Sequence, residues 1–153
     1  MHSLTIVFLA WVIGFGAFSF LARERLSRAF LNKKIPVLAG YYLLVIPIIL
    51  IEESLTIEVP YFWGILPMLV TFSIYFFLLY LVQRLGKIRS VYMVILCGSL
   101  GWVNEFLLVG RIHQMGGLIL VIMSILCWLI YAVMEILPAY YLQMALKERL
   151  SGA

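Results

Sequence analysis

Long apolar segments separated by short polar ones fill most of the chain. Five of them are long enough to cross a bilayer as helices: residues 4–22, 35–51, 61–83, 90–110 and 118–137. A helix of about 20 apolar residues spans a hydrocarbon core of about 30 Å. A further segment, residues 139–150, continues the helical pattern past Pro138, and its Lys147 and Arg149 are typical of a helix at the membrane interface. The pattern predicts an all-α, polytopic membrane helix bundle in which residues 1–153 form a single integral membrane domain.

The basic residues are distributed very unevenly around these segments. Of eleven Lys and Arg residues, all but Arg111 fall after the first segment, after the third segment or in the C-terminal helix. Basic residues accumulate on the cytoplasmic side of membrane proteins. The distribution therefore predicts five transmembrane helices with the N-terminus outside and the C-terminus inside. We therefore interpret the basic run at residues 23–34 as a cytoplasmic loop, and we expect no nucleic acid as a partner.

Composition excludes a soluble domain and several kinds of site. The chain is 65% hydrophobic and 12% charged, and its mean hydropathy is +1.12, which predicts a multi-pass protein of the cell membrane surrounded by lipids. Cys97 and Cys127 lie inside apolar segments without the spacing of a redox pair. His2 and His113 are too few and too far apart for a metal site. No glycine-rich nucleotide loop appears, so we expect no metal and no cofactor.

The fourth apolar segment carries two polar residues, Asn104 and Glu105. A carboxylate deep in hydrocarbon costs roughly 2.5 to 3.5 kcal/mol, so it normally faces the protein interior and often marks function. On a helix Cys97, Gly101 and Glu105 share one face, with Gly98 beside them. This run of small residues predicts close packing by another helix next to the carboxyl group.

Helical rise places further acids at the depth of Glu105. Counting about 1.5 Å per residue from the inner surface, Glu105 lies roughly 22 Å up its helix, and Glu52 and Glu53 lie roughly 26 Å up theirs. We therefore predict an outward-facing polar pocket, with Glu105, Asn104, Glu52 and Glu53 as catalytic candidates. Adjacent carboxyl groups in a low dielectric favour a protonated member, which can serve as a general acid.

Residues that would bind a substrate surround this pocket in the sequence. Arg111, His113 and Gln114 form a short polar turn over its mouth. Trp102 and nearby aromatic rings can hold an apolar substrate and stabilise cationic character. Such a site suits a lipid or an isoprenoid.

Glu135 is interpreted as a structural residue. Counted from the outer end of a helix that ends near residue 137, it lies about 27 Å deep, close to the cytoplasmic face. Gln83 and Arg84 are its predicted partners.

Three functions from different classes remain open. The first is a membrane-embedded enzyme that uses the outward-facing glutamates as general acid and base. The second is a small proton- or cation-coupled transporter, in which Glu105 binds the ion. The third is a non-catalytic subunit of a larger membrane complex, docked through the small-residue face at Cys97, Gly98 and Gly101. A homo-oligomer is compatible with each of them.

Overall fold

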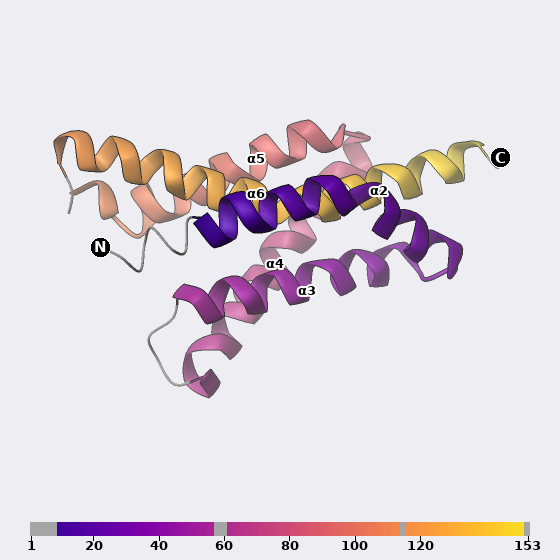
Figure 1. Ribbon diagram of the computed structural model, residues 1–153, viewed down its shortest axis with the longest axis horizontal. Helices are drawn as coiled ribbons and strands as arrows, with labels where there is room; N and C mark the ends of the chain where they lie inside the picture. Colours follow the sequence, from indigo (N-terminus) through magenta and orange to yellow (C-terminus); the bar gives the residue numbers. More distant parts are fainter. Residues whose placement is uncertain (1–8, 57–60, 114–115, 152–153) are drawn as a thin grey trace.

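A computed structural model describes residues 9–56, 61–113 and 116–151, and all regular structure in these ranges is helical (Figure 1). The elements are η1 (Leu9–Phe15), α2 (Gly16–Asn32), α3 (Val37–Thr56), α4 (Tyr61–Gly86), α5 (Ser90–Trp102), η2 (Val103–Leu108), η3 (Arg111–His113) and α6 (Gly117–Ser151). The short elements η1 and η2 are π-helical stretches: η1 leads directly into α2, and η2 follows directly after α5. Element η3 is a turn of 3₁₀-helix. The predicted all-α fold class is confirmed.

Within the described residues, four helices are long and apolar enough to cross a membrane: Val37–Ser54, Leu66–Gly86, Ser90–Leu108 and Gly117–Glu148. They correspond to the second to fifth predicted spans. The first five residues of the predicted first span, residues 4–22, lie outside the described residues. The part that is described forms η1 and the start of α2, and it is not among the four candidate spans. Which end of the bundle faces outward stays a prediction.

The basic run after the first apolar segment is helical. The predicted loop at residues 23–34 is wrong, because α2 continues to Asn32. Its Arg, Glu, Leu and Ala residues favour helix, and Glu24 and Arg28 form an ion pair one turn apart. The helix ends where Lys34 adopts a left-handed φ of 53°, just before Pro36.

The last helix is continuous through Pro138. The predicted break between residues 118–137 and residues 139–150 is wrong, because α6 is a single helix of 35 residues. A proline inside a helix removes one backbone hydrogen bond but does not have to end the helix when tertiary contacts hold both halves. Here Gln83 of α4 donates a hydrogen bond to the carbonyl oxygen of Ala139, at 2.8 Å.

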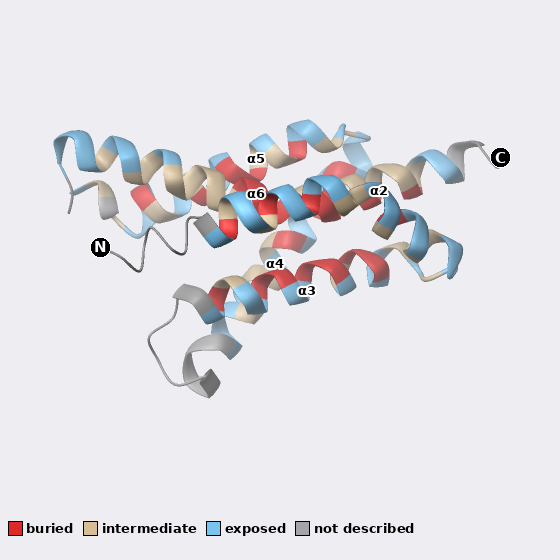
Figure 2. Cartoon of the chain, in the orientation of Figure 1, coloured by how far each residue is buried: buried red, intermediate tan, exposed pale blue. Residues whose placement is uncertain are grey.

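Helix α6 forms the centre of the bundle, and α2, α3, α4 and α5 all pack against it. In Figure 2 buried residues gather along α3 and the middle of α6, whereas the first turns of α6 are largely exposed. Helix α5 approaches α6 through glycine. A Cβ atom on Gly98 would come within 2.7 Å of the Trp128 ring, and one on Gly101 within 2.0 Å of the Tyr131 ring. The close packing predicted for this small-residue face is confirmed.

Candidate functional site

Three carboxyl groups meet at one end of the bundle, and we call Glu52, Glu53 and Glu105 the acidic cluster. Glu52 and Glu53 lie in the last turns of α3, and Glu105 lies in η2. The side chains of Glu52 and Glu53 are hydrogen-bonded to each other, and both interact electrostatically with Glu105. Glu53 is only 4% exposed, and the other two side chains are half-buried. A hydrogen bond between two carboxyl groups needs a proton on one of them, so this cluster is arranged to hold a proton.

Tyr131 of α6 completes the cluster. Its hydroxyl donates a hydrogen bond to Glu105 Oε1 at 3.1 Å. The ring lies against Gly101 on one helix and stacks with Phe72 of α4, with 6.1 Å between ring centroids. The glycine makes room for the ring, and the ring positions the hydroxyl. Sequence reasoning did not include Tyr131 among the site residues.

The two polar residues of the fourth segment, Asn104 and Glu105, both lie in the π-helical stretch η2. The N–H of Val109, the residue that follows η2, donates a hydrogen bond to the carbonyl oxygen of Asn104, five residues back, at 2.9 Å. Glu105 is half-buried between helices, whereas Asn104 is exposed. The structure thus does not bring Asn104 into the acidic cluster. Short π-helical insertions occur often at functional sites, where they redirect a side chain.

An open apolar groove of about 420 Å³ lies on α5 and α6 close to this cluster. Its lining residues are Trp102, Ser124, Ile125, Trp128 and Leu129. Trp102 precedes Glu105 by three residues, and Trp128 precedes Tyr131 by three, so each is about one helical turn away from the Glu105–Tyr131 hydrogen bond. Trp102, predicted as a substrate-binding residue, therefore lies in a groove that an apolar chain can enter.

The predicted polar mouth of the pocket is only partly described. Arg111 and His113 lie in η3, after Gly110, whose φ of 79° turns the chain. His113 is exposed. The Arg111 side chain and Gln114 lie outside what the structure describes, so the cover that these residues were predicted to form stays a prediction.

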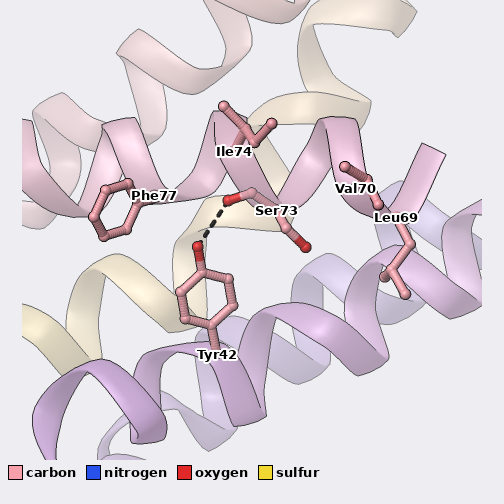
Figure 3. Close-up of a pocket in the computed structure, with 6 residues that line it drawn as sticks. All are labelled: Tyr42, Leu69, Val70, Ser73, Ile74 and Phe77. Carbon is pink, nitrogen blue, oxygen red and sulfur yellow. Dashed lines mark hydrogen bonds between the residues drawn. The ribbon is translucent and has the colours of Figure 1, made fainter. Parts of the chain in front are cut away.

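A second groove, of about 350 Å³, lies between α3 and α4 (Figure 3). Its walls are almost entirely apolar, and the half-buried hydroxyl of Tyr42 donates a hydrogen bond to the carbonyl oxygen of Ser73 at 2.7 Å. Tyr42 lies ten residues before Glu52 on α3, about 15 Å along the helix. This groove therefore lies apart from the acidic cluster.

Glu135 is fully buried inside the bundle, and its depth in a bilayer stays a prediction. It is 0% exposed in the middle of α6, and the Tyr41 hydroxyl of α3 lies 3.1 and 3.3 Å from its two carboxyl oxygens. The predicted partners Gln83 and Arg84 are wrong. Gln83 binds backbone carbonyl oxygens, including that of Ala139, and Arg84 donates to the hydroxyl of Tyr80.

The fold and the site define a class of protein: a helical bundle with four potential membrane-spanning helices and carboxyl groups enclosed between them. Among the described residues no group of three or more His, Cys, Asp or Glu side chains is arranged to hold a metal ion. Comparison of the chain with protein-family models, with curated proteins and with solved structures finds no match. The function is therefore argued from the geometry of the site.

Proposed function

We propose that the chain is a membrane-embedded enzyme of the cell membrane that uses the acidic cluster as general acid and base on a lipid or isoprenoid substrate. One observation carries this proposal: carboxyl groups from two helices meet within a helical turn of an open apolar groove. A proton-transfer catalyst needs a titratable group within reach of the substrate, and an apolar substrate needs an apolar surface beside it.

In this proposal Glu105 is the acid, and the hydrogen bond from Tyr131 orients its carboxyl group. Glu105 would give its proton to a carbon–carbon double bond of the substrate, leaving a carbocation. The indole faces of Trp102 and Trp128 would stabilise that positive charge. The pair Glu52 and Glu53 would take a proton from a neighbouring carbon and form a new double bond. One proton is given and one is removed, so the reaction is an isomerisation or a cyclisation that needs no oxidant and no cofactor.

Mass spectrometry of the small molecules bound to gently purified protein tests the proposal. Glu105→Gln keeps the shape of the side chain but cannot donate a proton to the substrate. The substrate of the proposed enzyme should therefore accumulate on this variant. Glu24→Gln, on the exposed surface of α2, is the matched control and should resemble the wild type. A specific lipid enriched on Glu105→Gln alone supports the enzyme, and the same bulk lipids on all three proteins would contradict it.

A proton- or cation-coupled transporter is the second candidate, and Glu135 favours it. A carboxyl group sealed in the centre of a membrane bundle is typical of ion pathways. Proton uptake by vesicles that contain the protein would distinguish this function from the first. A subunit role and a homo-oligomer stay predictions, but the face at Cys97, Gly98 and Gly101 that was predicted to dock a partner is already packed against α6.

A further inference from the structure

Glu135 is enclosed on every side by other helices. The carboxyl group has no exposed surface, and its hydrogen-bond partner is the hydroxyl of Tyr41, which is also fully buried. Both carboxyl oxygens lie within 3.3 Å of that hydroxyl oxygen. A hydroxyl has one proton to donate, so it can satisfy only one of these oxygens at a time.

The titratable groups around Glu135 are neutral in their ordinary forms. Those in electrostatic contact with it are Tyr41 of α3, Tyr75 of α4 and Cys97 of α5. Two of these already have their own partners: Tyr75 donates to the carbonyl oxygen of Cys97 at 3.0 Å, and the Cys97 thiol donates to that of Tyr131 at 3.2 Å. Together they provide no positive charge to balance a carboxylate.

Two arginines on neighbouring helices contact tyrosines instead of Glu135. On α2, the guanidinium of Arg23 lies over the ring of Tyr140, five residues or about 7 Å beyond Glu135 on α6. On α4, Arg84 is exposed and binds the hydroxyl of Tyr80. Between the described residues, ion pairing is limited to Arg28 with Glu24. No ion pair to Glu135 is therefore present in the part of the chain that the structure describes.

Burying an unpaired carboxylate costs far more than burying a neutral carboxylic acid, so such a group normally keeps its proton. We propose that Glu135, with Tyr41, is a proton-binding site in the interior of the bundle, separate from the acidic cluster, and that it holds a proton at neutral pH. The protonated carboxyl keeps the hydrogen bond from Tyr41 on its C=O oxygen. The site does not depend on the proposed enzyme.

Infrared spectroscopy of the full chain in lipid bilayers at neutral pH detects such a proton directly, because a protonated carboxyl group absorbs at its own C=O frequency. The wild-type spectrum minus that of Glu135→Gln should contain this band. Glu105→Gln should retain it even if substrate turnover is lost, so the two proposals fail independently. A difference spectrum that contains only carboxylate bands would overturn the proposal.

Two further measurements guard against misfolding and against a metal ion as the ligand. Tyr41→Phe keeps the carboxyl group and its packing but removes the hydrogen bond to the C=O oxygen, so the Glu135 band should move to higher frequency. An unmoved band would contradict the assignment. Replacing choline chloride by sodium chloride should leave the wild-type band unchanged. Loss of the band in sodium would mean that a metal cation displaces the proton, and would overturn the proposal.

Discussion

Carboxyl groups occupy two very different settings in this bundle. In the acidic cluster, three of them share one space near the end of α3, two are half-buried, and an apolar groove lies a helical turn away. Glu135, in the middle of α6, is alone, sealed, and bonded to one tyrosine. The first arrangement can exchange a proton with a molecule that arrives from the membrane. The second has no surface at which a molecule from outside the bundle could reach the carboxyl group.

The difference follows from what surrounds each group. Around the acidic cluster, like charges repel when they are ionised, and exposure lets them regain solvation. Around Glu135, packing excludes water, so an ionised carboxyl group there would be unsolvated and would destabilise the folded protein. Substitutions should therefore affect stability most in the sealed centre and chemistry most in the cluster.

The largest effect is expected from Gly101→Leu. A Cβ atom there would lie 2.0 Å from the Tyr131 ring, so α5 and α6 must separate and the hydroxyl must leave Glu105. We expect a loss of stability of about 3 kcal/mol or more, measured by thermal unfolding in detergent. Gly116→Leu is the matched control, because open space surrounds that glycine. Equal melting temperatures for the two variants would contradict the close contact.

The next prediction compares the two settings directly. Glu135→Ala leaves a cavity and an unpaired Tyr41 hydroxyl in a sealed interior, so it should cost about 2 to 4 kcal/mol. Glu105→Ala, at a half-buried position, should cost about 1 kcal/mol or less. Chemical unfolding of both variants measures the difference. If Glu105→Ala proved the more destabilising change, the contrast between a sealed and an accessible carboxyl would fail.

Tyr131→Phe should have a smaller effect on stability and a larger one on the chemistry. The ring that fills the space beside Gly101 remains, and only the hydrogen bond to Glu105 is lost, for about 1 kcal/mol. Because Glu105 would lose its orientation, the substrate bound to this variant should accumulate, as on Glu105→Gln. Lipid mass spectrometry beside a melting curve separates the two effects. A bound-lipid profile identical to that of the wild type would count against Tyr131 as a positioning residue.

The smallest effect is expected from Glu52→Gln, and it has the opposite sign. Removing one of three neighbouring acids relieves repulsion with Glu105 while the amide can still bond to Glu53. Stability should stay the same or rise by about 0.5 kcal/mol, since exposed and half-buried charge pairs contribute little. The melting temperature relative to the wild type provides the measurement. A clear loss of stability would mean that the Glu52 charge is compensated by a group of opposite sign.

Hydrophobic periodicity predicted the helical architecture and four helices that are long and apolar enough to span a membrane, but not where two of the helices end. Pro138 was interpreted as a boundary because proline can end a helix, and the basic residues from Arg23 onward because such residues mark the cytoplasmic end of a membrane span. Tertiary contacts decide otherwise: Gln83 holds the backbone beyond Pro138, and good helix formers carry α2 to Asn32. Contacts between residues distant in sequence are not visible in a local pattern.

Local sequence patterns also predicted one of the two carboxyl sites better than the other. Helical rise alone was enough to place Glu52, Glu53 and Glu105 at one level, because each lies near a helix end. For Glu135 the count assumed a span that stops near residue 137, but α6 continues to Ser151 and other helices bury this side chain completely. Its partner Tyr41 lies 94 residues earlier, a pairing that no spacing rule predicts.

The length of α6 has a consequence for the surrounding bilayer. Its apolar stretch, Gly117–Glu148, contains 32 residues and is therefore about 48 Å long, against a hydrocarbon core of about 30 Å. A helix of that length fits an ordinary membrane only by tilting steeply or by thickening the lipid around it. Helices α2, α3, α4 and α5 all pack on α6. A change in bilayer thickness that altered the tilt of α6 would therefore shift the whole bundle.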